Sequence, residues 1–310
     1  MESDKIIIGT RGSRLALYQA NKVKQELENQ CPDLTVEIKI IKTKGDKILD
    51  VALSKIGDKG LFTKELEVAL LCKEIDLAVH SLKDLPTELP QEFTIGAVLE
   101  RADFRDALVS KGGLKLRELT GDHTIATSSL RRIAGLKKVN ADFTIVDIRG
   151  NVNTRLQKME DGYCDAMIMA AAGLKRLGLD KYITEVLEPA EFIPAVAQGA
   201  IAVETRAGDS GVNNVLQRIN HMPTQQAVTA ERAFMRSLEG GCQVPVGAYS
   251  TSRNGEITLT GFVSSLNGDN YLKETLTDKA ENAGMLGEKL AEKLVEKGAK
   301  EILKDIRSNG

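Results

Sequence analysis

The sequence is poor in the residues that build metal sites, disulfide frameworks and aromatic nucleic-acid platforms. Its 310 residues include four cysteines, three histidines and no tryptophan, and aromatic residues make up 4%. The cysteines carry no C-x-x-C spacing, which argues against disulfides and zinc and favours a reducing compartment, the cytoplasm. We therefore expect no metal, and the few aromatics disfavour a single-stranded nucleic-acid binder.

Neither charge nor hydropathy points to a membrane or to a nucleic acid. Lys plus Arg total 42 against 44 for Asp plus Glu, so the net charge of -2 creates no field that would attract a polyanion, and any basic site must be local. The longest apolar stretch, residues 166–174, is about half of the roughly 18 residues that a membrane span needs. The first residues lack the features of a signal peptide, so we expect no export.

Strands and helices alternate through the first 200 residues. Strands are expected at 6–9, 36–40 and 77–79, with helical spacing of apolar residues at 16–27 and 66–70 between them. After a polar stretch near 99–106, a second run places strands at 124–127, 144–148 and 166–169, each followed by a helical pattern. This alternation predicts two similar α/β lobes with largely parallel sheets.

The pattern changes from Pro223 onward. A long helix precedes Gly240-Gly241-Cys242, and three strands are expected at 244–250, 257–264 and 271–276. Asn254-Gly255 and Asn267-Gly268 predict hairpin turns between them, and one final helix is expected over 283–306. We therefore expect a small α+β domain over 218–310, a second lobe over 100–196, and a first lobe that combines 1–99 with about 197–217.

Basic residues, hydroxyls and glycines gather in the turns that follow the expected strands. In parallel sheets these turns form the ligand crevice. They are residues 9–14, 80–84, 127–132, 149–155 and 172–176. Between Thr127 and Lys158 seven Lys or Arg face only two Asp, a local excess of five positive charges. A ligand with several carboxylates is therefore favoured over a nucleotide, because neither a phosphate-binding P-loop nor G-x-G-x-x-G is present.

Three further features have both a chemical and a structural interpretation. Asp84 could stabilise a cation or shuttle a proton, or it could cap a helix or pair with Lys83. Ser128 and Ser129 suit anion binding and helix capping better than nucleophilic attack, because no G-x-S-x-G or triad histidine accompanies them. Cys242 lies in a glycine-rich loop where a thiol can be approached, although a lone loop cysteine is more often incidental.

Several longer motifs stand together in this chain. They are Gly9-Thr10-Arg11-Gly12-Ser13, Lys59-Gly60-Leu61-Phe62, Val79-His80-Ser81-Leu82-Lys83-Asp84-Leu85-Pro86, Thr127-Ser128-Ser129-Leu130-Arg131-Arg132, Arg149-Gly150-Asn151, and Glu231-Arg232-Ala233-Phe234 leading to Gly240-Gly241-Cys242-Gln243-Val244-Pro245-Val246-Gly247. Together they resemble the porphobilinogen deaminase (hydroxymethylbilane synthase) family over nearly the whole chain. Two small departures are Ala197, where the family usually has glycine, and residues 90–93, which lack the usual glycine.

The resemblance implies a fold and an activity. The fold would be two periplasmic-binding-protein-like α/β lobes with a hinge, plus the small α+β domain. The enzyme would be a monomeric cytoplasmic transferase of haem biosynthesis whose Cys242 carries a dipyrromethane cofactor through a thioether. Four porphobilinogen units would be added to this primer, each with loss of ammonia, and the linear tetrapyrrole hydroxymethylbilane would be released.

The resemblance also implies roles for individual residues. Asp84 would be catalytic. The cofactor would be held by Cys242, Lys83, Asp84, Thr127, Ser128, Ser129, Arg131, Arg132 and Gly150. The substrate would be held by Arg11, Ser13, Gln19, Arg149, Arg155, Arg176 and Gln198. Lys55 and Lys59 lie in a polar, glycine-rich segment that could serve as a lid.

A non-catalytic binding protein is the alternative, because two lobes around an anion crevice also describe soluble ligand-capture proteins. It leaves Asp84 and the Gly-Gly-Cys loop without a purpose.

Overall fold

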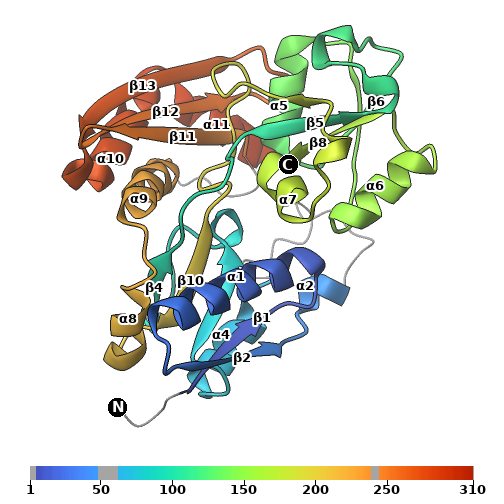
Figure 1. The fold of residues 1–310 in the computed structure, drawn as a ribbon. Coiled ribbons are helices and arrows are strands. Elements are labelled where there is room, and N and C mark those ends of the chain that lie inside the picture. The colour runs from blue at the N-terminus through green and yellow to red at the C-terminus, as the bar shows by residue number, and fades with distance from the viewer. Residues whose placement is uncertain (1–4, 48–61, 239–243, 310) are drawn as a thin grey trace. The chain divides into compact units, whose positions relative to one another are not determined.

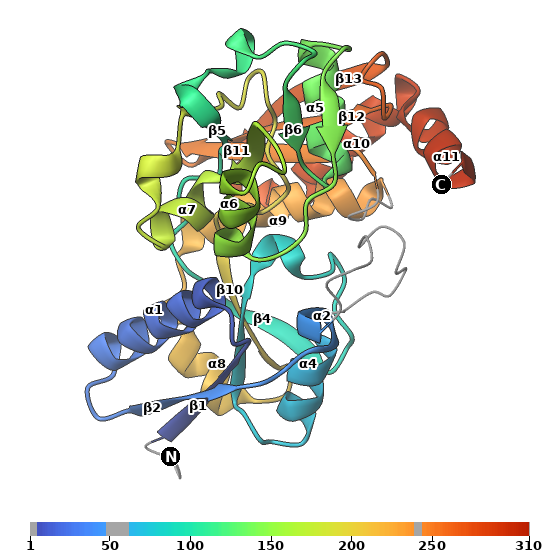
Figure 2. The same cartoon turned by 90° about the vertical axis from the view of Figure 1, so that its right-hand side faces the viewer.

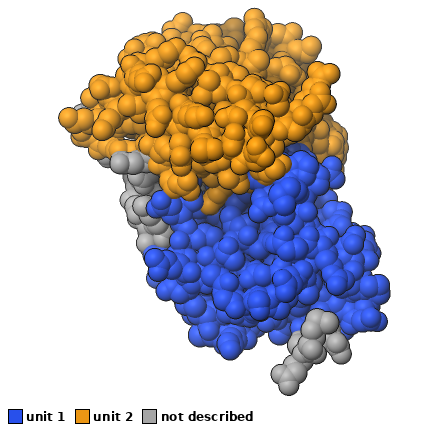
Figure 3. Space-filling view, turned by 90° about the vertical axis from the view of Figure 1, so that its left-hand side faces the viewer, with its two compact units in different colours: residues 1–51, 57–102, 199–225 blue, residues 52–56, 103–198, 226–310 orange. Residues whose placement is uncertain are grey.

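A computed structural model describes residues 5–47, 62–238 and 244–309. These residues fall into two compact units, coloured separately in Figure 3. The first unit contains residues up to 102 together with 199–225, and the second contains 103–198 together with 226–309. The chain therefore leaves the first unit after residue 102, returns to it at residue 199 and leaves it again after residue 225.

The first unit is built on a five-stranded sheet (Figure 1). Its strands and helices are β1 (Lys5–Thr10), α1 (Arg14–Gln30), β2 (Thr35–Ile40), α2 (Lys44–Lys47), α4 (Lys64–Leu71), β3 (Leu77–Ser81), β4 (Phe93–Val98), β10 (Ile201–Arg206) and α8 (Ser210–Leu216). The strand order is β2-β1-β3-β10-β4. β1 runs parallel to β2 and β3, and β10 runs antiparallel to β3 and β4.

Apolar residues on both faces of this sheet explain why helices cover it on two sides. α1 buries Ala20, Val23 and Leu27 against one face, where Leu216 of α8 also packs. α4 buries its residues 66, 69 and 70 against the other face. Figure 2 shows α1 and α8 on one side of the strands and α4 on the other. Such strands, buried on both faces, read as continuous apolar runs in the sequence.

The second unit contains a sheet with the same pattern. Its elements are β5 (Asp106–Ser110), β6 (Thr124–Ala126), α5 (Leu130–Val139), β7 (Thr144–Val146), α6 (Val152–Glu160), β8 (Ala166–Ala170), α7 (Ala171–Arg176) and β9 (Glu185–Val186). The order is β7-β6-β8-β5-β9, with β6 parallel to β7 and β8, and β5 antiparallel to β8 and β9. β5 therefore has the place here that β10 has in the first sheet.

The C-terminal part of the chain forms an antiparallel sheet with helices. Its elements are α9 (Met222–Ser237), β11 (Val246–Arg253), β12 (Glu256–Ser264), β13 (Tyr271–Lys279), α10 (Ala283–Glu296) and α11 (Ala299–Asn309), in the sheet order β11-β12-β13. The expected Asn254-Gly255 turn is confirmed, because both residues have the positive φ, 52° and 80°, of a type I′ hairpin. The single final helix expected over 283–306 is wrong: the chain breaks at Lys297–Gly298, where Gly298 has a φ of 99°.

The expected fold class is confirmed. The chain contains two α/β sheets of matching strand order and a three-stranded antiparallel sheet with helices. None of the helices in the described ranges is long and apolar enough to cross a membrane.

Candidate active site

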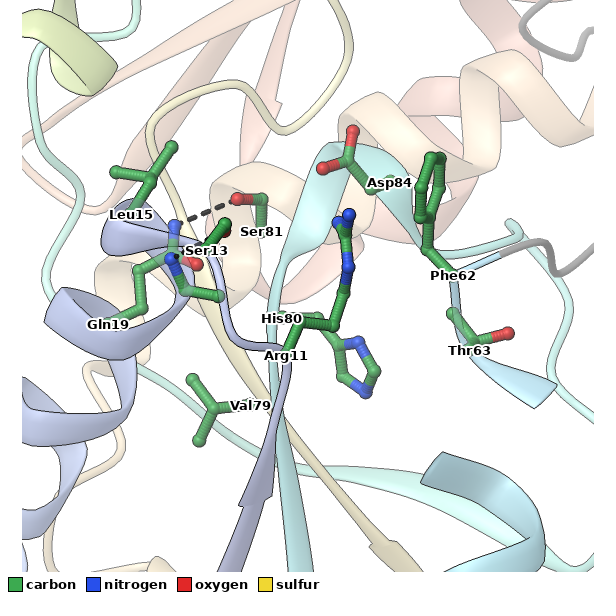
Figure 4. A pocket seen from close by; sticks show the side chains of 11 residues that line it. Arg11, Ser13, Leu15, Gln19, Phe62, Thr63, Val79, His80, Ser81 and Asp84 are labelled. Atoms are coloured by element: carbon green, nitrogen blue, oxygen red, sulfur yellow. Dashed lines mark hydrogen bonds between the residues drawn. The ribbon is translucent and has the colours of Figure 1, made fainter. Parts of the chain in front are cut away.

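A polar pocket of the first unit lies where β1 and β3 end. These strands are parallel neighbours, so the turns that follow them lie at one edge of the sheet. The residues around the pocket come from these turns, from the start of α1 and from the residues before α4 (Figure 4). They are Arg11, Ser13, Leu15, Ala16, Gln19, Phe62, Thr63, Val79, His80, Ser81 and Asp84. Four of the expected site residues are therefore neighbours: Arg11, Ser13, Gln19 and Asp84.

Arg11 and Asp84 give this pocket one group of each charge. The Arg11 guanidinium carbon lies 4.1 Å from the centre of the Phe62 ring, a cation–π contact that orients the side chain. Figure 4 shows the guanidinium beside this ring and extending toward the Asp84 carboxylate. Asp84 is exposed and is the one carboxylate among the described residues that line the pocket. The pocket can therefore meet an anionic group and a cationic group of the same ligand.

Hydrogen bonds fix the helix that borders this pocket. The Ser13 hydroxyl accepts from the backbone N–H of Ala16 at 3.3 Å and caps α1. One turn further along, the buried Gln19 amide donates to the Ser81 hydroxyl at 2.8 Å and ties α1 to the end of β3. Lys83 lies in the turn Leu82–Asp84 and is half-buried.

One residue of the pocket, His80, pairs with a buried carboxylate of β10. His80 Nε2 is 3.0 Å from Glu204 Oε2, and the side chains are 6% and 0% exposed. The other carboxylate oxygen, Glu204 Oε1, is buried without a hydrogen-bond partner in the described structure. Sequence analysis quoted His80 only as part of a motif and did not single out Glu204.

In the second unit, Arg131 and Arg132 share the carboxylate of Asp106. Arg131 Nη1 donates to Asp106 Oδ2 at 2.7 Å, and Arg132 Nη2 donates to Asp106 Oδ1 at 2.7 Å. Burial tends to raise the pKa of Asp106, but the two guanidinium charges outweigh it and hold the pKa well below its usual range. Gln198, expected to bind substrate, is fully buried here and donates to Asp106 Oδ1 at 2.9 Å.

Two hydroxyl groups of the turn before α5, those of Thr127 and Ser128, form hydrogen bonds within the protein. The Ser128 hydroxyl donates to the carbonyl of Ile148 at 2.9 Å and accepts from its N–H at 3.1 Å. Thr127 Oγ1 accepts from the N–H of Ser129 at 3.3 Å. Ser129 occupies the N-cap position of α5, so its expected position is confirmed. Its side chain makes no capping hydrogen bond, so the expected capping role is wrong.

The turn between β7 and α6 presents Arg149, Gly150 and Arg155. Arg155 Nε donates to the carbonyl of Gly150 at 2.9 Å, which folds this side chain back over the turn. Gly150 has a φ of 115°, a conformation that favours glycine, and a Cβ there would lie 2.8 Å from a side-chain carbon of Thr154. Arg149 Nη1 is buried and has no partner in the described structure. Arg176 ends α7 and is half-buried.

Three expected site residues, Lys55, Lys59 and Cys242, lie outside the described residues. The sequence reasoning missed Asp106, which it placed in a polar stretch before the second lobe. The available signal was an acidic residue directly before the apolar run Ala107-Leu108-Val109. Among the described residues, no three His, Cys, Asp or Glu side chains gather as metal ligands would.

Comparisons with known proteins cover nearly the entire chain. Residues 6–214 match the model of the porphobilinogen deaminase dipyromethane cofactor binding domain, and residues 225–296 match that of the porphobilinogen deaminase C-terminal domain. The porphobilinogen deaminase of Desulforamulus reducens is 50% identical over 304 residues, 98% of either chain. That of Chlorobium chlorochromatii is 48% identical over 310 residues, again 98% of either chain.

The chain belongs to the porphobilinogen deaminase family. It is therefore an enzyme, a transferase that polymerises porphobilinogen on a dipyrromethane cofactor in tetrapyrrole biosynthesis. Among solved structures, the methionine binding protein MetQ is similar at a TM-score of 0.44 and 14% identity, covering 70% of this chain and 90% of that one.

The residues of the second unit fit the cofactor of porphobilinogen deaminases. Each pyrrole of a dipyrromethane carries an acetate and a propionate, so the cofactor needs several cationic partners. The trio of Arg131, Arg132 and Asp106 carries one net positive charge, and Arg149 Nη1 is a buried donor without a partner in the described structure. Donors of this kind lower the free energy of a bound carboxylate.

Proposed function

We propose that Asp84 is the catalytic carboxylate of this transferase. As ammonia leaves porphobilinogen, positive charge develops on the substrate's pyrrole ring, and an ionised carboxylate nearby stabilises that charge. The observation that supports this role is that Asp84 is the one carboxylate among the described residues lining a pocket that also contains Arg11. When bound, the cofactor supplies the pyrrole carbon to which each new unit is joined.

The other residues of the two units hold carboxylates in this proposal. Arg11, Ser13 and Gln19 of the first unit would bind substrate groups, and so would Arg149, Arg155 and Arg176 of the second. Gln198, whose buried amide donates to Asp106, would act through that cluster. The cofactor would be attached to Cys242 and held by Lys83, Asp84, Thr127, Ser128, Ser129, Arg131, Arg132 and Gly150. Lys55 and Lys59 would belong to a lid. Guanidinium groups suit this task because their planar N–H pairs match a carboxylate.

We also propose the organisation and setting that the sequence suggested. The first lobe would comprise 1–99 and about 197–217, the second lobe 100–196 and the C-terminal domain 218–310. The enzyme would work as a monomer in the cytoplasm without a nucleic-acid partner. Scattered cysteines and a net charge of -2 support this setting.

Replacement of Asp84 tests the proposed mechanism. Asp84→Asn keeps the shape of the side chain and removes its charge, so turnover should fall about 100-fold or more. Steady-state release of ammonia from porphobilinogen measures this, and intact mass shows whether the cofactor is still attached. Asp33→Asn, at an exposed site after α1, is the matched control. Near-normal turnover in a cofactor-loaded Asp84→Asn enzyme would remove Asp84 from the mechanism.

A further inference from the structure

Asp106 is enclosed by donors from three parts of the second unit. Its side chain is fully buried at the start of β5. It accepts hydrogen bonds from both arginines at the start of α5 and from Gln198, which precedes the return to the first unit. A carboxylate with this many charged and neutral donors has its position fixed on both oxygens.

Backbone carbonyls fix the two guanidinium groups from the other side. Arg131 Nη1 also donates to the carbonyl of Ile193 at 2.6 Å, and Arg132 Nη1 donates to the carbonyl of Ile168 at 2.8 Å. Arg132 Nε adds a third bond, to Asp106 at 3.2 Å. Each guanidinium plane is therefore held at two or more points.

Both guanidinium groups keep N–H groups that the described protein does not use. The hydrogen bonds of Arg131 all leave from Nη1, so its Nε and Nη2 make none within the described residues. Arg132 retains one hydrogen on each terminal nitrogen. Nε and Nη2 form the edge with which arginine binds a carboxylate at two points.

The charges of this cluster do not balance. Asp106 is the one carboxylate that pairs with either arginine in the described structure, so two positive charges meet one negative charge. The two arginine side chains are only 5% and 9% exposed. A net charge is costly at such a place, and burial lowers the pKa of Arg131 accordingly. One further anion would complete the cluster.

We propose that Asp106 is a positioning residue that orients the Arg131 and Arg132 guanidinium groups and leaves them one net positive charge for one carboxylate of the cofactor. This inference rests on the proposed function, which assigns both arginines to the cofactor. Asp106 itself does not touch the cofactor and acts through the arginines.

The loading of the cofactor tests this role without relying on turnover. The full-length chain is produced in cells that make no porphobilinogen, porphobilinogen is then added, and intact mass follows the fraction that has gained the cofactor. Asp106→Asn raises the positive charge of the cluster, so simple attraction would speed loading. A positioning role predicts the opposite: the loading rate of Asp106→Asn should fall about 10-fold or more. Asp103→Asn, which removes a carboxylate paired with Arg105 and Lys175 on the same connection, should load at the wild-type rate.

A double variant separates positioning from a general structural defect. If Asp106 acts through the arginines, Asp106→Asn should slow loading by a smaller factor in an Arg131→Met background than in wild type, because only Arg132 is then left for Asp106 to orient. Two outcomes would overturn the inference and leave the proposed function intact. In the first, the effects of Asp106→Asn and Arg131→Met on the loading rate multiply in the double variant. In the second, Asp106→Asn loads at the wild-type rate although Arg131→Met loads slowly. Wild-type loading by Arg131→Met would overturn the proposed role of Arg131 and the inference with it.

Gln198→Leu provides a milder change if Asp106→Asn does not fold. It removes one donor to Asp106 and keeps all three charges. Loading should slow several-fold in wild type and by a smaller factor in the Arg131→Met background, where only Arg132 is left for Asp106 to orient. An effect of equal size in both backgrounds would count against the inference.

Discussion

The backbone N–H of Ala197 donates to a carboxylate oxygen of Glu231 at 2.7 Å, and both residues are fully buried. The other oxygen of this carboxylate accepts from the N–H and the hydroxyl of Ser250, at 2.9 Å and 2.7 Å. Glu231 of α9 thereby joins the segment before β10 to strand β11. Ala197 is held there with a φ of 60°, in the left-handed region that glycine adopts more easily.

The backbone at Ala197 should tolerate glycine and reject branched side chains. Ala197→Gly relieves about 1 kcal/mol of strain. It also loses a buried methyl group and gains unfolded-state entropy, so its free energy of unfolding should stay within about 1 kcal/mol of wild type. Ala197→Val should lose about 2 kcal/mol or more, because a β-branched residue is strained there. Urea unfolding measures both, and Ala200→Gly is the control. Equal stability of the valine variant would contradict the assigned conformation.

Arg149 should matter for extension of the chain more than for folding. Its buried Nη1 has no partner in the described structure, so Arg149→Leu leaves no protein acceptor unpaired there and should keep the thermal midpoint nearly unchanged. Chain extension should slow about 10-fold or more through loss of a charged hydrogen bond. Mass spectrometry of the covalent intermediates measures extension. Lys158→Met, beside the same turn, is the control, and unchanged extension in Arg149→Leu would show that its carboxylate contact is misplaced.

The bond between Gln19 and Ser81 should affect substrate binding and stability together. Ser81→Ala leaves the buried Gln19 amide without its acceptor and should cost about 1 kcal/mol or more of stability. KM for porphobilinogen should rise more than kcat falls, because the side chain borders the pocket and does not carry charge. Thermal unfolding and steady-state kinetics measure these effects. Asn21→Ala, which removes an exposed bond within the same helix, should change neither.

The raised pKa of the Cys164 thiol predicts that the protein loses stability at alkaline pH. Burial raises the pKa of this thiol to about 11, above the ordinary value of 9.0. The folded state favours the neutral thiol, so its contribution to stability is complete below pH 9 and decreases as the pH rises toward 11. The difference in unfolding free energy between wild type and Cys164→Ala should therefore shrink over this range. At pH 8 a thiol reagent should modify exposed Cys72 well before Cys164.

Local patterns were sufficient for most of the parallel strands. The alternation at 36–40 and the apolar run at 77–79 match β2 and β3, because burial on one or both faces leaves a mark within a few residues. β4 and β5 were missed. These two short strands lie on either side of the stretch near 99–106. The polar residues of that stretch interrupt the apolar pattern from which a strand is predicted.

In the candidate site, too, features within a short segment could be predicted, and contacts between residues far apart in the sequence could not. Basic turns could be recognised because each is a short sequence feature. The counter-ion of Arg131 and Arg132 could not, because Asp106 lies 25 and 26 residues away along the chain. A count of charges between 127 and 158 therefore overstated the free positive charge, and Gln198, expected at the substrate, is part of this buried cluster.

The position of β10 has a consequence for synthesis of the protein. It separates β3 from β4 in the sheet, although residues 201–206 follow both by about a hundred residues. On the ribosome, β3 and β4 therefore emerge without the strand that pairs with each of them, and their edges stay open while the second sheet is translated. Truncated nascent chains that end before residue 201 should expose these edges to chaperones and proteases, and chains long enough for residues 201–206 to have left the ribosome should not.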